Sequence, residues 1–295
     1  MRPDFIKTNV SLKQHCTLKI GGLADYFVEP ENEEQVAEAL GFAKEKVIPY
    51  FVIGHGSNLL FDDEGYRGLI IKLADKFAQI DINENSIRVQ TGAWMPYVAR
   101  KAQQAGLVGL EHTVGIPGNV GGIITMNAGS QRKSIATHLK KICIMTEEGE
   151  KRMLTPDQCD FGYRQSIFQN KTWIILSAEI ECEYGDKKQI RSEMRKILKE
   201  RRLKFPRKQP NCGSVFKSNP AMYQQYGPPG KIIEDLGLKG FCIGDVCIAP
   251  QHANFFVNTG KASCHDFKRM LLKVEIDCRK RNLFLVPEVQ VIPEQ

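Results

Sequence analysis

The stretch "GIPGNVGG", from Gly115 to Gly122, holds four glycines and one proline in eight residues. It lies within "GLEHTVGIPGNVGGIITMNAGS", which is almost free of charge although 25% of the chain is charged. A second glycine-rich turn, "GHGSN" from Gly54 to Asn58, directly follows the apolar run "PYFVI". Glycine lets a backbone turn sharply or approach another molecule, and N–H groups in such turns form nests for phosphate. The two turns together predict a diphosphate that lies between two subdomains.

Neither turn matches the commoner nucleotide-binding motifs. A P-loop requires Gly-Lys followed by Ser or Thr, and neither turn has that sequence. Leu59 stands where the third glycine of a G-x-G-x-x-G fingerprint belongs. The sequence therefore argues against both a P-loop and a Rossmann dinucleotide site.

The composition is that of an ordinary globular protein. The chain has 295 residues, of which 42% are hydrophobic, and this length suggests two domains or three small ones. No run of 18 apolar residues occurs, and the N-terminus lacks the apolar core of a signal peptide. We therefore expect a cytoplasmic protein without membrane insertion.

The nine cysteines include no C-x-x-C pair, and the closest spacing is from Cys242 to Cys247. A metal site would need tighter ligand pairs with histidines at fixed offsets. The weaker alternative is a metal site whose ligands would be Cys247, His252, Cys264 and His265. We expect reduced thiols and no metal.

The net charge of +7 is unevenly distributed, because residues 187–208 contain eleven Lys or Arg and two acids. Ile190, Met194 and Ile197 recur at helical spacing beneath this charge, which predicts an amphipathic surface helix. A nucleic-acid-binding segment is the alternative, but it lacks interleaved aromatic residues for base stacking. We expect no nucleic-acid partner.

The remaining periodicity predicts an α+β fold with mixed sheets in at least two domains. Helices are expected near residues 36–47, 94–105, 230–237 and 263–282, with Gly106 ending the second and Ser263 beginning the last. The domain boundary is placed at "KFPRKQP", because Pro206 and Pro210 prevent helix continuation.

Eight blocks in this order resemble the UDP-N-acetylenolpyruvoylglucosamine reductase family, over nearly the whole chain. They are "TLKIGGLADYF", "GHGSNLL", "GIPGNVGG…MNAG", "DFGYRQSIF", "CGSVFKSNP", "EDLGLKG", "HANFFVN" and "LVPEV". The length resembles the shorter subtype without an extra tyrosine-bearing loop.

The resemblance implies a vanillyl-alcohol-oxidase/PCMH-type fold with noncovalently bound FAD. Residues 1–203 would form the FAD-binding region, with subdomains of about 1–75 and 76–203, and residues 204–295 the substrate domain. Asn58 and Asn127 would bind cofactor oxygens, and His55 is a loop residue. The implied FAD-binding set is Gly54, Gly56, Ser57, Asn58, Leu59, Thr113, Gly115, Ile116, Pro117, Gly118, Gly121, Gly122, Asn127 and Gly129.

The implied reaction reduces an enolpyruvyl ether of a UDP-sugar to a lactyl ether. NADPH gives a hydride to FAD, and the reduced flavin gives it to the substrate methylene carbon. Arg164 would pair with the carboxylate, Glu288 would stabilise the enolate-like intermediate, and Ser214 would donate the proton. The implied substrate-binding residues are Tyr163, Lys217, Asn219, Lys239 and His252, and a monomer is expected.

The sequence departs from the family pattern in three places. "SQRKS" follows "MNAG", "FKSNP" carries a one-residue insertion, and Asp245 and Ala249 replace a glycine and a serine. These changes affect the loop expected beside the flavin, the choice between Ser218 and Asn219 as the residue facing substrate, and the expected nucleotide contacts.

Three other functions are alternatives to the reductase. An oxidase on the same flavin scaffold would share the glycine turns without needing Arg164, Ser214 and Glu288 together. A serine hydrolase built on Ser214 and His252 lacks a G-x-S-x-G elbow. A nucleic-acid binder would act through residues 187–208 with a steep salt dependence.

Overall fold

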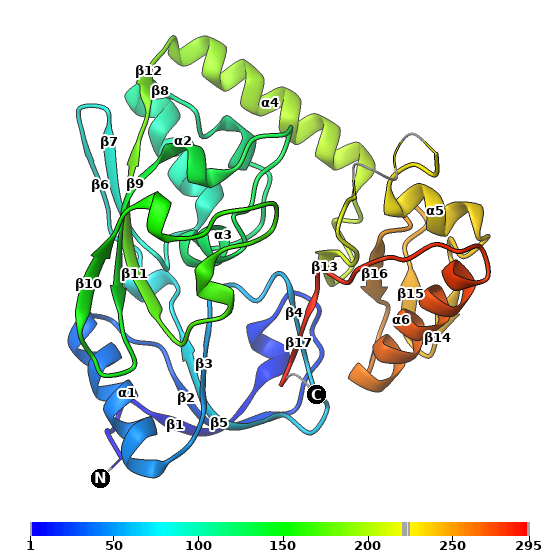
Figure 1. Ribbon diagram of the computed structural model, residues 1–295, viewed down its shortest axis with the longest axis horizontal. Helices are drawn as coiled ribbons and strands as arrows, with labels where there is room; N and C mark the ends of the chain where they lie inside the picture. The colour runs from blue at the N-terminus through cyan, green and yellow to red at the C-terminus, as the bar shows by residue number, and fades with distance from the viewer. Residues whose placement is uncertain (1, 220–222, 224, 294–295) are drawn as a thin grey trace. The chain divides into compact units, whose positions relative to one another are not determined.

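The computed structural model describes residues 2–219, 223 and 225–293, which form two compact units (Figure 1). Unit 1 comprises Met1–Thr8, Tyr26–His55 and Arg67–Arg201. Unit 2 comprises Asn9–Asp25, Gly56–Tyr66 and Arg202–Gln295. The last boundary lies close to the one expected from the sequence. The grouping differs in that two early segments belong with the C-terminal residues.

The first sheet of unit 1 has the strand order β1-β2-β5-β3. Strands β1, β2 and β5 run from one unit into the other, and β3 pairs with β5 in parallel. Helix α1 (Glu33–Lys46) begins at Asn32, whose side chain accepts the Gln35 N–H, and its apolar face enters the core. The strands are β1 (Lys7–Ser11), β2 (Leu23–Val28), β3 (Tyr50–Ile53) and β5 (Tyr66–Lys72).

The second sheet of unit 1 is antiparallel, with the order β10-β9-β11-β7-β6 (Figure 1). Its strands are β6 (Ile80–Asn83), β7 (Ser86–Gln90), β9 (Leu139–Met145), β10 (Lys151–Leu154) and β11 (Ile174–Glu181). Helices α2 (Met95–Ala105) and α3 (Val120–Thr125) share its apolar core, and β8 (Leu107–Val108) pairs with β12 (Glu183–Tyr184). Gly106 ends α2 in the left-handed conformation at φ 80°, as the sequence predicts.

Helix α4 (Lys187–Lys204) confirms the amphipathic reading of the basic segment. Ile190, Met194 and Ile197 are buried in the unit 1 core, whereas most of the basic side chains are exposed. The charge is therefore largely a solvated face. No helix among the described residues is long and apolar enough to cross a membrane.

The sheet of unit 2 has the order β13-β16-β15-β14, and α6 lies along β14 and β15 beside α5 (Figure 1). Its elements are β13 (Asn211–Ser214), α5 (Pro229–Asp235), β14 (Cys242–Ile243), β15 (Val246–Ile248), β16 (Phe255–Asn258) and α6 (Cys264–Arg279). The predicted cap of α6 is confirmed, because the Ser263 hydroxyl accepts the Asp266 N–H at 3.0 Å. A separate parallel pair joins β4 (Leu59–Phe61) to β17 (Gln290–Ile292).

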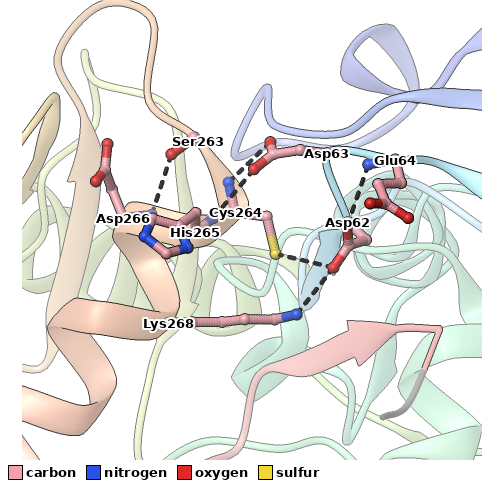
Figure 2. Close-up of polar contacts among 8 residues, drawn as sticks. All are labelled: Asp62, Asp63, Glu64, Ser263, Cys264, His265, Asp266 and Lys268. Carbon is pink, nitrogen blue, oxygen red and sulfur yellow. Dashed lines mark hydrogen bonds and ion pairs between the residues drawn. The ribbon is translucent and has the colours of Figure 1, made fainter.

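Two aspartates after β4 attach this early segment to α6 (Figure 2). The Asp63 carboxylate accepts the backbone N–H groups of Cys264 and His265 at 2.9 and 3.1 Å. These are first-turn N–H groups without partners inside the helix, and a carboxylate is the favourable charge at this end. Lys268 adds an ion pair to Asp62 at 2.8 Å. These contacts explain why segment 56–66 belongs to unit 2.

The expectation that all the thiols are reduced is wrong for one pair. Cys242 and Cys247 form a disulfide, because β14 and β15 place them directly opposite each other with a Cα–Cα distance of 4.1 Å. The other cysteines are buried free thiols. Among the described residues, no group of three or more His, Cys, Asp or Glu side chains could hold a metal ion.

Candidate functional site

The glycine turns of unit 1 meet at Asn119. Gly54 follows β3, and a Cβ on it would lie 2.9 Å from the Asn119 side-chain oxygen. Asn119 is buried and donates its amide to the Gly92 carbonyl, but its oxygen accepts no hydrogen bond from the described residues. A buried acceptor beside a close backbone approach suits a ligand that carries a donor. The sequence analysis did not single out this residue.

Only part of the Gly115–Gly122 backbone is available to form a nest. The N–H groups of Ile116, Val120 and Gly121 donate to protein carbonyls at 2.9–3.0 Å. A ligand could therefore meet Ile116 and Gly121 only through their other atoms. Gly122 is exposed, and its Cβ position has no heavy atom within 4 Å. The backbone at Gly122 is thus open to close approach.

Three other predicted cofactor residues in unit 1 serve its internal structure. Asn127 donates to the Gly162 carbonyl at 2.9 Å and accepts the Ala136 N–H at 3.2 Å. The buried Thr113 hydroxyl donates to Leu110 at 2.7 Å. A Cβ on Gly129 would collide with the Lys133 carbonyl oxygen, so this position requires glycine for internal reasons. Flavin contact by these residues stays a prediction.

Asn127 helps to hold the turn that presents Arg164. Gly162 and Gln165 exchange both backbone hydrogen bonds, which leaves Tyr163 and Arg164 at the tip. Arg164 adopts a φ of 55°, and its guanidinium donates to the Gly129 carbonyl at 3.3 Å. The same guanidinium lies over the exposed Tyr163 ring, 5.4 Å from its centre. The turn directs a cation toward the glycine-bearing segments.

Arg201 is a second cation in this part of unit 1, and the sequence analysis treated it as part of a solvated face. Its side chain lies against Gly115, where a Cβ would be 2.6 Å from the Arg201 Nε atom. Burial and the positive charge of Arg164 lower the pKa of Arg201 to about 10. The contact between Gly115 and Arg201 joins two residues that are far apart in the sequence. No local sequence motif could therefore have revealed Arg201.

In unit 2, Thr17 holds the second glycine turn in place. Its backbone N–H donates to the Gly56 carbonyl at 3.1 Å, and its hydroxyl donates to the Asn211 carbonyl at 2.6 Å. Gly56 has a φ of 66°, and a Cβ there would lie 2.7 Å from the Cα atom of Cys16. Glycine is therefore required at this position. Thr17 links the turn to the start of β13, the strand that ends at Ser214.

Ser214 and Glu288 lie on neighbouring segments of unit 2. The residue after Ser214, Val215, accepts the Glu288 N–H at 2.7 Å through its carbonyl. Asn58 donates its side-chain amide to the Glu288 carbonyl at 2.9 Å. A Cβ on Gly213 would lie 3.9 Å from the Ser57 carbonyl oxygen. The unit thus brings the predicted proton donor, the predicted enolate stabiliser and part of the predicted flavin turn together.

Asn254 fixes the segment that carries Ser214. Its side-chain oxygen accepts the Phe216 N–H and its amide donates to the Phe216 carbonyl, both at 2.9 Å. Its backbone carbonyl accepts the Val215 N–H at 2.8 Å. Such double pairing of a buried amide defines the backbone position closely. This role was not expected from the sequence.

The predicted substrate residues of unit 2 are not all equivalent. Lys217 is partly buried and its N–H donates to Val286 at 2.8 Å, whereas Asn219 and Lys239 are exposed. Lys239 forms an ion pair with Glu234 at 3.0 Å. His252 packs its ring against Phe205 and Phe255, and its burial lowers the pKa of its imidazole. His252 is therefore a neutral, packed side chain at pH 7.

The departures at Asp245 and Ala249 have internal explanations. The Asp245 carboxylate accepts the Lys261 N–H at 2.7 Å, which fixes the loop after β16. Ala249 is fully buried beside Phe255 and Val257. Neither contact involves the predicted substrate residues.

Comparisons with known proteins match both units. An FAD binding domain matches residues 24–154, and the C-terminal domain of UDP-N-acetylenolpyruvoylglucosamine reductase matches residues 205–292. UDP-N-acetylenolpyruvoylglucosamine reductase 1 of Corynebacterium glutamicum is 41% identical over 96% of this chain and 85% of its own. The Clostridioides difficile reductase is 35% identical over 99% and 94%.

A solved structure agrees with these sequence relatives. The crystal structure of UDP-N-acetylenolpyruvylglucosamine reductase from Thermus caldophilus has a TM-score of 0.84 at 31% identity. The match covers 98% of this chain and 100% of that one. The predicted fold class, an FAD-binding fold of the PCMH type followed by a C-terminal α+β domain, is confirmed.

Proposed function

The chain belongs to the UDP-N-acetylenolpyruvoylglucosamine reductase family, and we propose that it reduces UDP-N-acetylglucosamine enolpyruvate to UDP-N-acetylmuramate with NADPH. The product is a precursor of peptidoglycan, and the reaction belongs in the cytoplasm. The observation that carries this proposal is the placement of Glu288 beside the Ser214–Val215 segment, with Asn58 on its carbonyl. It brings the backbone of the residue with the proposed carboxyl next to the segment that carries the proposed hydroxyl and to a predicted flavin turn.

The residues present fit FAD. Gly54 and Gly122 allow close backbone approach in unit 1, and the Asn119 oxygen is a buried acceptor without a donor among the described residues. In unit 2, Gly56, Ser57 and Asn58 form a second predicted flavin turn, which Thr17 holds. When bound, FAD would supply the hydride chemistry that connects NADPH to the substrate. These residues orient the cofactor and exclude water from it.

The three proposed catalytic residues have separate tasks. Arg164 pairs with the substrate carboxylate, and a guanidinium does so through two parallel hydrogen bonds. Glu288 stabilises the enolate-like charge that develops on the substrate. Ser214 donates the proton that completes the reduction. Serine is a weak acid, so this transfer depends on a carbanion-like carbon held against its hydroxyl.

The remaining assignments complete the proposal. Tyr163, Lys217, Asn219, Lys239 and His252 bind the UDP-sugar, with His252 acting through packing because it is neutral. Residues 1–203 form the FAD-binding region and residues 204–295 the substrate domain of a monomer. The exposed basic face of α4 is solvated and binds no nucleic acid.

The test is the activity of the purified protein. It is expected to be yellow, to release FAD on denaturation, and to consume NADPH over many turnovers only when the enolpyruvyl substrate is present. FMN in place of FAD, or a colourless protein that does not take up FAD, would remove the proposal. Oxygen uptake without NADPH consumption would favour an oxidase on the same scaffold.

A further inference from the structure

We propose that one face of α4 binds the surface of an anionic lipid bilayer. The face carries a basic stripe of four residues in unit 1, which are Lys188, Arg191, Arg195 and Lys199. The binding is peripheral, because it uses positive charge on the outside of the protein and inserts no part of the chain. It goes beyond the proposed reduction and does not depend on it.

The basic stripe runs along one side of the helix. Its members follow one another at intervals of three, four and four residues, and residues at these intervals are neighbours on a helix surface. All four are exposed, whereas the other side of α4 is buried in the apolar core of unit 1. At a rise of 1.5 Å per residue the stripe is about 16 Å long. The helix therefore presents a continuous row of positive charge to its surroundings.

The charge of the stripe has no compensation within the helix. No Asp or Glu stands three or four residues from any of its members. The neighbours at these intervals include further basic residues, since Arg191 lies beside Arg195 and Arg195 beside Lys199. Like charges at this spacing destabilise a helix. None of the four side chains forms an ion pair or a hydrogen bond with another residue that the structure describes.

Helix α6 shows the opposite arrangement. It is also amphipathic and carries exposed basic residues, but these are paired along the helix. Arg279 pairs with Glu275 and Lys273 with Asp277, each at 2.5 Å and four residues apart. A surface helix of this chain can therefore balance its charges internally. In α4 the repulsion within the stripe is relieved only by anions from outside.

The surroundings of the stripe favour lipid headgroups over a nucleic acid or an acidic protein. Between Lys188 and Lys199, no exposed residue is aromatic or apolar. The stripe therefore offers no platform for base stacking and no anchor for the centre of a protein interface. Since the other side of α4 is packed on the core, the helix cannot enter a DNA groove, where a recognition helix is enclosed by two walls.

An anionic bilayer needs none of these features. Clusters of roughly four to eight basic residues on an amphipathic helix bind anionic headgroups through charge alone. A straight row on the outside of a protein can meet a flat surface along its whole length. The partner that fits the stripe is thus a bilayer rich in anionic phospholipid.

The experiment measures binding of the purified protein to lipid vesicles by co-sedimentation. One set of vesicles is phosphatidylcholine alone, and the other has equal parts of phosphatidylcholine and the anionic lipid phosphatidylglycerol. The stripe variant carries Lys188→Gln, Arg191→Gln, Arg195→Gln and Lys199→Gln. The control variant changes exposed basic residues elsewhere in unit 1, with Lys44→Gln, Lys46→Gln, Arg100→Gln and Lys141→Gln. Both variants lose the same net charge, so only the position of the lost charge differs.

The wild type is expected to bind the phosphatidylglycerol vesicles and not those of phosphatidylcholine alone. Its affinity should fall as KCl is raised, because salt screens exposed charges. Each basic residue near an anionic bilayer contributes roughly fivefold to the affinity, so the stripe variant should bind roughly 10²-fold or more weakly. The control variant should lose less than about tenfold, since its charges lie away from the contact.

A second variant, Arg191→Lys with Arg195→Lys, keeps the charge and changes the geometry of the side chains. It should bind as tightly as the wild type, because headgroup attraction depends on charge and not on a planar guanidinium. Circular dichroism checks that the stripe variant is folded, which is expected because its substitutions remove repulsion within α4.

Three outcomes would overturn the proposal. The first is failure of the wild type to bind phosphatidylglycerol vesicles at low ionic strength. The second is an equal loss of binding in the stripe and control variants. The third is displacement of the protein from the vesicles by duplex DNA or polyglutamate at the same concentration of negative charge, which would identify a nucleic acid or an acidic protein as the better partner.

Discussion

The glycine stretch of unit 1 and the Ser214–Glu288 region of unit 2 are constructed differently. The Gly115–Gly122 stretch is one continuous segment, held by Thr113 and by the backbone of Thr91, Ala93 and Met95 earlier in unit 1. Glu288 is held by Asn58 and Val215, which lie far from it along the chain. The glycines of the first region are close together in the sequence, so the sequence displays them as a motif. The parts of the second region come from distant segments, and each part looks unremarkable by itself. We propose that the first region holds the cofactor and the second performs the chemistry.

The largest expected effect tests the chemical role of unit 2. Glu288→Gln keeps the backbone bonds to Val215 and Asn58 because they involve only main-chain atoms of Glu288. If the acidity of Glu288 matters, substrate reduction should slow by roughly 10²- to 10³-fold, the scale of a lost oxyanion-stabilising group. Steady-state turnover with NADPH measures it.

The matched control for Glu288→Gln is Glu275→Gln, an exposed change on α6 that removes only an ion pair with Arg279. It should leave turnover unchanged. Turnover close to that of the wild type in both Glu288→Gln and Glu288→Ala would contradict the catalytic assignment of Glu288. The proposed chemical role of the unit 2 region would then lose its main support.

The next effect separates the two half-reactions. Ser214→Ala should slow flavin reoxidation by the enolpyruvyl substrate by roughly 10²-fold, the usual worth of a positioned proton donor. Bleaching of the flavin by NADPH should be unaffected, because no substrate proton takes part in it. Stopped-flow absorbance follows both steps. Equal slowing of both would show that Ser214 supports the fold or the cofactor and not protonation.

A smaller effect concerns His112, which is buried in unit 1 close to the glycine stretch. Burial, followed by the nearby charges of His138 and Lys133, lowers the pKa of His112 to about 4 from an ordinary value of 6.5. Between these values the unfolded chain binds more protons than the folded one, so stability falls as the pH falls. At pH 5 the loss relative to pH 7 is about 2 kcal/mol.

Urea unfolding at pH 7 and pH 5 measures the His112 contribution. His112→Phe cannot titrate, so it should lose less stability between the two pH values than the wild type. Equal losses in the two proteins would mean that His112 is already charged, or that it is more exposed in solution than in this structure.

The smallest effect on stability comes from Gly122→Ala. Gly122 lies inside α3 with no heavy atom near its Cβ position, so alanine should change the free energy of unfolding by less than about 1 kcal/mol, in the stabilising direction. FAD affinity should nevertheless fall, because the methyl group occupies space that the cofactor needs. Calorimetry of the apoprotein and FAD titration measure the two quantities separately.

The contrasting variant is Gly129→Ala, whose Cβ would collide with the Lys133 carbonyl oxygen. It should destabilise unit 1 directly, by roughly 1–3 kcal/mol. If Gly122→Ala binds FAD as tightly as the wild type, the cofactor does not approach Gly122. Another part of unit 1 would then have to contact the cofactor.

Local signals allowed much of the fold to be predicted. The end of α2 at Gly106 and the start of α6 at Ser263 follow from backbone conformation and capping, which depend on a few adjacent residues. The apolar face of α4 follows from periodicity. The Cys242–Cys247 disulfide was missed because it depends on the register of two strands, which composition does not reveal.

The sequence by itself determined the family resemblance, the order of the elements and the two glycine turns, because these depend on residues that act through their neighbours in the chain. Tertiary structure alone decided that segment 56–66 joins unit 2, that Asn58 holds the Glu288 backbone and that Arg201 lies against Gly115. Each of these contacts joins residues separated by many positions. Such contacts form only when the whole unit has folded, since the entropy of closing long loops must be offset by the packing of many residues at once.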